Sequence, residues 1–298
     1  MDETKKHRSG FVNIIGNPNV GKSTLMNLLV GEKLSIVTSK AQTTRHRIMG
    51  IVNGADYQIV YSDTPGILKP NYKLQESMMG FVDTAISDAD IILYVTDVVE
   101  KSDKNADYIE RLNSTPVHVI VAINKIDLSN QENLEELYGR WRELLPKAEI
   151  FPVSATEKFN ITPLFDKVIQ LLPESPPWYD KETFTDRNLR FFASEILREK
   201  ILLNYSKEIP YCTEVVIDSF QERDKIYNID AIIYVTRESQ KGIIIGKGGQ
   251  LLKKVGTQAR KDMEAFFEKR VFLQIFVKVN PNWREDNRKL KQFGYIQA

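Results

Sequence analysis

The stretch Gly16-Asn17-Pro18-Asn19-Val20-Gly21-Lys22-Ser23 decides the fold of the first half of this chain. It has the form GxxxxGK[ST], whose glycines let the backbone curl so that several N–H groups point at one anion. An apolar run, Phe11 to Gly16, precedes it, and Lys22 to Leu29 reads as a helix that adds its positive end. A glycine turn with only a structural role would need neither the preceding apolar run nor the following helix. The pattern therefore predicts a phosphate-binding loop, with Lys22 at the β- and γ-phosphates and the Ser23 hydroxyl on Mg²⁺; we expect Thr24 to contribute to the same site.

Further apolar segments alternate with helical ones along residues 1–175. They are read as strands and run over Tyr57 to Ser62, Ile91 to Thr96, Val117 to Ile123 and Ile150 to Val153. Strands that are apolar on both faces indicate a mostly parallel sheet covered by helices, an α/β fold. Ligands of such folds bind at the carboxyl ends of the strands.

Asp63-Thr64-Pro65-Gly66 lies just past one of these strands. A carboxylate there can hold the Mg²⁺ shell, and the Gly66 N–H can meet a γ-phosphate because glycine permits close approach. Alone, such a tetrapeptide is more often a simple strand-end turn. The phosphate-binding loop upstream favours its interpretation as part of a nucleotide site. The next residue is Ile67, which cannot orient a water through its side chain as a glutamine would.

Asn124-Lys125-Ile126-Asp127 follows the strand Val117 to Ile123 and predicts the choice of base. The Asp127 carboxylate can accept both N1–H and the 2-amino group of guanine, whereas adenine would leave a buried carboxylate unpaired. We expect Lys125 to lie over the base plane and Asn124 to tie the base loop to the phosphate loop. After the next strand, the N–H of Ala155 in Ser154-Ala155 can read the guanine O6 atom.

Composition sets outer limits. The 298 residues are 42% hydrophobic and 27% charged, which is globular and excludes fibrous or disordered classes. No apolar run approaches the ~20 residues of a membrane helix, and the N-terminus lacks the pattern of a signal peptide. The single cysteine, Cys212, excludes an internal disulfide and cysteine-based zinc modules, which favours a reducing cytoplasm.

The two halves differ in charge. Residues 1–175 hold 19 Lys and Arg against 23 Asp and Glu, whereas residues 241–298 hold 13 against 5, a net charge of +8. This asymmetry predicts a polyanionic partner for the C-terminal part, with a merely solvated basic face as the alternative.

The proline-rich stretch Pro173 to Tyr179 marks a domain boundary. After it the pattern runs helix, strand, strand, helix, helix, strand. Between the last two helices lies Gly246-Lys247-Gly248-Gly249, a GxxG loop next to Ile244 and bordered by lysines. A bland helix–helix turn is the alternative, but the local charge favours a clamp on single-stranded nucleic acid. We expect its contacts from Lys241, Ile244, Gly246, Lys247, Gly248, Gly249, Lys253 and Lys254.

These elements together resemble known families. Residues ~10–175 resemble TRAFAC-class GTPases, and Thr43-Thr44-Arg45 resembles their Era and MnmE-like branch, which implies that Thr44 completes the Mg²⁺ shell. Residues ~186–281 resemble a type II KH domain. The combination resembles the Era family, with a GTPase domain over 1–175, a linker over 176–187 and a KH domain with its tail over 188–298.

The resemblance implies a GTPase that binds GTP and GDP with Mg²⁺ and assigns catalytic roles to Lys22, Thr44 and Gly66. By likeness to MnmE, Asn19 would help hold a stimulating K⁺. It also implies binding of the 3′ region of 16S rRNA, help in 30S subunit maturation, and a cytoplasmic protein loosely associated with the inner membrane. A monomer is our expectation.

Three alternative functions find less support in the sequence. No second set of convergent catalytic residues supports a GTP-driven synthetic enzyme. A membrane-trafficking GTPase lacks lipidation signals, although the basic, amphipathic segment Arg190 to Tyr205 could touch lipid. A tandem GTPase of the Der type would need two phosphate loops, and one is present.

Overall fold

The computed structural model describes residues 6–100 and 105–296. The chain divides into two compact units. The first consists of Met1–Ser35, Thr44–Lys69 and Met78–Asp186; the second consists of Ile36–Thr43, Pro70–Ser77 and Arg187–Ala298.

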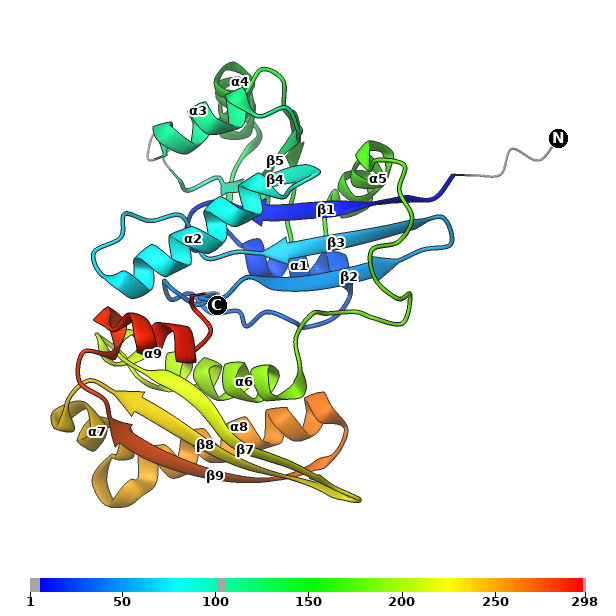
Figure 1. Ribbon diagram of the computed structural model, residues 1–298. Helices are drawn as coiled ribbons and strands as arrows, with labels where there is room; N and C mark the ends of the chain where they lie inside the picture. The colour runs from blue at the N-terminus through cyan, green and yellow to red at the C-terminus, as the bar shows by residue number, and fades with distance from the viewer. Residues whose placement is uncertain (1–5, 101–104, 297–298) are drawn as a thin grey trace. The chain divides into compact units, whose positions relative to one another are not determined.

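A six-stranded sheet in the order β2-β3-β1-β4-β5-β6 forms the centre of the first unit (Figure 1). Its strands are β1 (Arg8–Ile15), β2 (Ile48–Asn53), β3 (Tyr57–Asp63), β4 (Ile91–Asp97), β5 (His118–Asn124) and β6 (Glu149–Pro152). All neighbouring pairs are parallel except β2–β3. The predicted mostly parallel sheet is confirmed, and the carboxyl ends of the parallel strands bring the sequence motifs to one edge.

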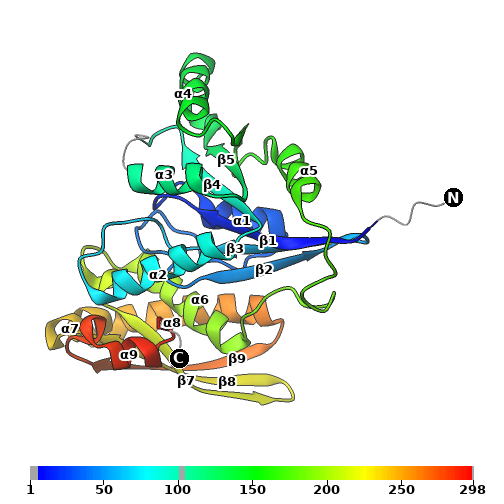
Figure 2. The ribbon, with the colours of Figure 1, turned by 45° about the horizontal axis from the view of Figure 1, so that its top comes forward.

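Helices flank this sheet, as Figure 2 shows from a second direction. They are α1 (Lys22–Val30), α2 (Lys73–Ser87), α3 (Ala106–Ser114), α4 (Gln131–Leu144) and α5 (Ile161–Leu171). All seven residues of β4 are buried, so both faces of the sheet have to be covered at this strand. In the described residues, no helix is long and apolar enough to cross a membrane.

Strand β2 was not predicted. It is a short edge strand that contains Gly50, so it lacks the continuous apolar run of its neighbours. A Cβ at Gly50 would meet Val30, Leu34 and Met26 side chains within 2.9 Å, so the glycine lets β2 lie close to α1.

Residues 176–186, predicted as part of a linker, lie along β2 and β3 in the first unit. The Ile51 N–H donates to the Phe184 carbonyl at 2.9 Å. Gln58 Oε1 accepts from the Trp178 and Tyr179 N–H groups at 2.7 and 3.0 Å. The prolines thus begin an extended strap that satisfies the backbone at the edge of the sheet.

The second unit contains a three-stranded sheet in the order β7-β8-β9, with β7–β8 antiparallel and β8–β9 parallel. Its elements are α6 (Leu189–Asn204), β7 (Glu214–Arg223), β8 (Ile226–Val235), α7 (Glu238–Ile245), α8 (Gln250–Phe267), β9 (Arg270–Val279) and α9 (Asn287–Gln292). The predicted order of helix, strand, strand, helix, helix and strand is confirmed. One face of the sheet forms a common core with α6, α7 and α8.

Helix α6 is not a free amphipathic surface. Its apolar residues Ala193, Leu197 and Ile201 are fully buried in the core of the second unit. The core of the unit thus uses these apolar residues of Arg190 to Tyr205, and contact of the exposed side of the helix with lipid stays a prediction.

Candidate nucleotide site and nucleic-acid groove

The phosphate-binding loop, Gly16 to Ser23, follows β1 and opens α1 as predicted. Gly16 has φ +145°, and a Cβ there would lie 2.1 Å from the Val95 carbonyl oxygen. Gly21 has φ +96°, and a Cβ there would meet Asn124 Nδ2 at 2.2 Å. Both positions therefore require glycine, and the loop can curl only with these residues.

Lys22 lies inside this loop. Its ammonium group donates to the carbonyl oxygens of Gly16 and Asn17 at 3.0 and 2.8 Å. Burial lowers the pKa of Lys22 to about 8, which the charges of Asp63 and Glu100 oppose. Among the described residues, these two carbonyls are the hydrogen-bond partners of the ammonium group. A buried cation in this setting fits an anionic ligand, because phosphate charge would compensate the desolvation.

The three residues predicted to hold Mg²⁺ meet at one point. Ser23 Oγ donates to Asp63 Oδ2 at 2.6 Å, and Thr44 Oγ1 lies 3.2 Å from the same oxygen and 2.9 Å from Ser23 Oγ. The other carboxylate oxygen, Oδ1, is buried without a hydrogen-bond partner in the described part of the chain. Burial also raises the pKa of Asp63. Two hydroxyls and a buried carboxylate with one oxygen unbonded fit Mg²⁺, which completes its shell with phosphate and water oxygens.

The loop after β3 braces the phosphate loop. A Cβ at Gly66 would lie 2.7 Å from Pro18 backbone atoms, so the glycine permits this approach. The Thr64 hydroxyl donates to the Ile14 carbonyl at 2.7 Å, and Pro65 is buried beside it. The Ile67 N–H donates to the Gly16 carbonyl at 3.1 Å, and its side chain is buried.

Asn124 joins the base loops to the phosphate loop, as the sequence predicted. Its Nδ2 donates to the Val20 carbonyl at 2.9 Å, and its Oδ1 accepts from the Ala155 N–H at 3.0 Å. Ala155 thus uses its N–H within the protein, and its contact with guanine O6 stays a prediction.

The base-reading side chains surround the Asn124 link. The Ser154 hydroxyl donates to Asp127 Oδ1 at 2.6 Å, which orients the carboxylate. Asp127 and Leu128 are exposed at this edge, beside Ile126. The carboxylate is therefore open to a bound base, which would bury it, and its recognition of guanine stays a prediction.

Asp97 belongs to the site but lies in none of the sequence motifs. It ends β4, and its Oδ2 forms an ion pair of 2.5 Å with the Lys125 ammonium, which also donates to the Asn19 carbonyl at 2.6 Å. Lys125 has φ +60°, so its backbone is in the left-handed region. Asp97 and Asn19 thus set the direction of the Lys125 stem, and a carboxylate at the end of a fully apolar strand was the available signal.

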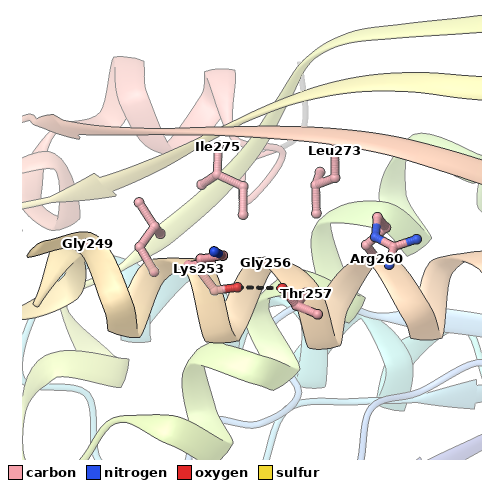
Figure 3. A pocket seen from close by; sticks show the side chains of 8 residues that line it. Gly249, Lys253, Gly256, Thr257, Arg260, Leu273 and Ile275 are labelled. Carbon is pink, nitrogen blue, oxygen red and sulfur yellow. Dashed lines mark hydrogen bonds between the residues drawn. The ribbon is translucent and has the colours of Figure 1, made fainter.

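The second unit carries a groove between α8 and β9, with a volume of about 370 Å³ (Figure 3). Leu252, Leu273 and Ile275 give it apolar walls, and Lys253 and Arg260 add positive charge. At Gly256 a Cβ would meet Ile275 Cδ1 at 3.0 Å, so this glycine keeps the space between helix and strand. The groove can accept planar apolar groups joined to anions.

The groove ends at the GxxG loop. Gly246, Gly248 and Gly249 have φ values of +70°, +59° and +76°. A Cβ at Gly248 or Gly249 would meet nothing within 4 Å, so the loop backbone is open to an incoming phosphate. Lys247, Lys253 and Lys254 are exposed around it, and Lys241 is half-buried.

Ile244 corrects the sequence prediction. Its side chain is fully buried in the core, and its carbonyl accepts from the Tyr205 hydroxyl at 2.6 Å. It cannot contact RNA there and supports the loop from behind. Ile243 and Leu251, at 47% and 39% exposed, are the apolar side chains at the surface on either side of the loop.

The fold and the two sites define a P-loop GTPase unit followed by a KH domain. Family models agree, since residues 11–125 match the 50S ribosome-binding GTPase family and residues 208–284 match the KH domain. The GTPase Era of Clostridium kluyveri is 43% identical over 97% of this chain and 99% of that protein. That of Syntrophus aciditrophicus is 45% identical, over 97% and 95%. The chain belongs to the Era family of GTPases and hydrolyses GTP.

Solved structures that match nearly the full length of the chain include two of Era proteins. A variant of the Aquifex aeolicus Era bound to GDP and AlF4⁻ is 37% identical with a TM-score of 0.93, covering 97% of this chain and 100% of that one. An Era in complex with MgGDPNP and nucleotides 1506–1542 of 16S ribosomal RNA has the same identity and TM-score, covering 98% and 100%. Nucleotide complexes in such close relatives agree with the fit of this site to a magnesium-bound guanine nucleotide.

Proposed function

We propose that this chain is a GTP-hydrolysing switch that binds single-stranded RNA from the 3′ region of 16S rRNA and assists maturation of the 30S subunit. The observation that carries the proposal is the α8–β9 groove, which has apolar walls and a cationic rim and opens at a glycine loop whose backbone is free to receive phosphates. The complex of a 37% identical Era with a 16S rRNA fragment supports the choice of RNA.

In the nucleotide site, we propose the roles that the contacts favour. Lys22 and the Gly66 N–H face the β- and γ-phosphates, and Ser23, Thr44 and Asp63 hold Mg²⁺. Bound Mg²⁺ supplies positive charge to the phosphate oxygens. Asn19, with φ +67° and an exposed side chain, is the proposed ligand for a stimulating K⁺.

A charge at Gly248 tests the RNA clamp. Gly248→Asp places a carboxylate in open space next to the proposed phosphate path, so the variant is expected to fold. The matched control is Gly248→Asn, because asparagine has nearly the same shape and also tolerates a positive φ. We expect Gly248→Asp to weaken binding of a 16S rRNA 3′-end oligonucleotide by at least tenfold relative to Gly248→Asn, with GDP affinity unchanged in both.

Fluorescence anisotropy with labelled RNA gives the dissociation constants. Equal RNA affinities for the two variants would contradict the clamp. Loss of GDP binding in both would instead show damage that spreads beyond the loop.

For the cellular role, we propose that depletion of the protein causes precursors of the 30S subunit and of 16S rRNA to accumulate, which sucrose gradients and RNA gels measure. A normal subunit profile in depleted cells would oppose a role in maturation. A monomeric state and peripheral association with the inner membrane are further proposals that rest on the family resemblance; light scattering and flotation with lipid vesicles test them.

A further inference from the structure

Strand β9 carries a regular alternation of basic, aromatic and polar side chains on one face. These residues are Arg270, Phe272, Gln274, Phe276 and Lys278, and we call them the β9 outer row. All five are exposed, and the two phenylalanine rings are 56% and 44% exposed. Isolated exposed apolar residues are normal, but two rings on one strand between two cations form a pattern.

The β9 outer row lies on the face of the sheet opposite to the KH groove. Side chains alternate along a strand, and the intervening Leu273 and Ile275 line the groove against α8. Helices cover that inner face, whereas β9 is an edge strand of its sheet. A nucleic-acid strand leaving the groove therefore has to pass only one edge strand to reach the outer row.

The neighbours of the row limit how far its apolar surface extends. Phe272 pairs with Asn228, Gln274 with Asp230, and Phe276 with Ile232 on β8. Asn228 and Asp230 are half-buried and polar, and Ile232 is buried at 3% exposure. Phe272 thus lies beside a polar side chain, whereas Phe276 lies beside the buried aliphatic side chain of Ile232.

The same face carries more positive charge at the end of the strand. Lys278 pairs with Tyr234, whose ring lies 5.6 Å from that of Phe293 in the C-terminal segment. Helix α9 in that segment contains Arg288, Lys289 and Lys291, and the acidic residues Glu285 and Asp286 directly precede it. Among the outer-facing partners of the row on β8, Asp230 is the one carboxylate.

We propose that the β9 outer row is a second RNA-contacting surface, on which Phe272 and Phe276 stack unpaired bases of the strand that continues from the KH groove. The inference rests on the proposed function. At about 3.3 Å per residue the two rings lie roughly 13 Å apart along β9, so each engages a different base. A KH groove holds only about four nucleotides, so a longer bound RNA needs further contacts.

A protein partner fits this surface less well. Protein interfaces are depleted in lysine, and charged residues are rare at their centres. Exposed aromatic rings between cations on a sheet are instead the arrangement by which proteins stack single-stranded bases. The charge and the spacing therefore favour RNA.

The test compares two RNAs on the full chain. One is an oligonucleotide of about four residues from the 3′ region of 16S rRNA, sized for the groove. The other extends it by about fifteen residues on its 5′ side. Phe272→Ala/Phe276→Ala is expected to weaken the long RNA by about tenfold or more and the short RNA by less than twofold. Phe272→Tyr/Phe276→Tyr should restore binding because it keeps the rings.

Phe159→Ala is the matched control, since this ring in the first unit is 59% exposed and lacks a basic row. Equal affinity of the alanine double variant and the wild type for the long RNA would overturn the inference. A change in oligomeric state in the alanine variant would also overturn it and would assign the face to protein contact. The Gly248→Asp variant tests the groove separately. If it still binds both RNAs, the proposed groove is wrong, and this result differs from one in which only the outer row is wrong.

Photocrosslinking gives a readout that does not depend on variants. Trypsin cuts after Arg270 and Lys278, so both rings lie in one peptide, residues 271–278. We expect nucleotide adducts of the long RNA on Phe272 or Phe276 by tandem mass spectrometry. Adducts of the long RNA confined to peptides of the GxxG loop and α8, or to Leu273 and Ile275 within residues 271–278, would count against the second surface.

Discussion

Replacing Asn124 with alanine is expected to destabilise the first unit and to weaken nucleotide binding in the same variant. The Asn124 side chain is 2% exposed and links two loops that are distant in sequence. It donates to the Val20 carbonyl at 2.9 Å and accepts from the Ala155 N–H at 3.0 Å. Both backbone partners belong to buried residues, so alanine leaves a donor and an acceptor unpaired at once.

The size of the effect follows from those two groups. Leaving a buried polar group unsatisfied costs about 1–3 kcal/mol, so two such groups lower the free energy of unfolding by roughly 2–4 kcal/mol if water partly enters the gap. In a unit of this size, each kcal/mol shifts the midpoint by about 2–4 °C. The expected loss is therefore roughly 4–16 °C.

Calorimetry of the full chain measures this shift in the transition that GDP stabilises, which identifies the first unit. Asn113→Ala is the matched control, because Asn113 is exposed and its side chain donates to the Leu144 carbonyl at 2.8 Å. We expect the control to lose under about 0.5 kcal/mol. A fluorescent GDP analogue should bind Asn124→Ala at least tenfold more weakly at a temperature where the variant is folded.

Two results would refute this reasoning. One is a midpoint for Asn124→Ala within about 2 °C of the Asn113→Ala control. The other is an unchanged affinity for GDP despite the lower stability, which would mean that the link between Val20 and Ala155 does not shape the nucleotide site.

Three further predictions concern the same site. Asp127→Asn should reduce the preference for GTP over xanthosine triphosphate by at least tenfold in competition binding, since an amide cannot accept from both N1–H and the 2-amino group; an intact preference would remove Asp127 from base recognition. Ser23→Ala should raise the Mg²⁺ concentration needed for half-maximal GTP hydrolysis, because one of the oxygens around Asp63 is lost. Ser129→Ala, at a half-buried position outside that cluster, is the control. Equal Mg²⁺ requirements of the two variants would argue against Ser23 as a ligand. Hydrolysis should be faster in KCl than in NaCl, and Asn19→Ala should abolish the difference; equal rates of the wild type in the two salts would exclude the K⁺ site.

The nucleotide site was predictable because its residues lie in short contiguous motifs at strand ends. Once a strand is placed, the parallel topology decides where its next residues lie, and Ser23, Asp63 and Asn124 needed no more than that. Asp97 was not predicted, since a single carboxylate after a strand has no motif of its own. The exposure of Asp127 also depends on how far its loop extends beyond the sheet, which local sequence does not encode.

Ile244 shows a different limit. Ile243, Ile244 and Ile245 are consecutive, and successive residues of a helix point about 100° apart. The sequence therefore allowed any one of them to face the core, and the packing of α7 in the second unit selects Ile244. Strand β2 was missed for a related reason, because its role at the edge depends on contacts with β3 and with the strap of residues 176–186.

Ile67 holds the phosphate-binding loop in place through its backbone N–H and its buried side chain. The side chain is 4% exposed, and the N–H holds the Gly16 carbonyl, which also accepts from Lys22. Residue 67 thus fixes the phosphate loop against the end of β3 instead of orienting a water. Hydrolysis by this chain must then depend on positioned charge, from Lys22 and the cations held near it, because the residue at the usual water-orienting position is buried and apolar. A K⁺ ion beside the phosphates would supply charge of this kind. The comparison of hydrolysis rates in KCl and NaCl therefore tests this account.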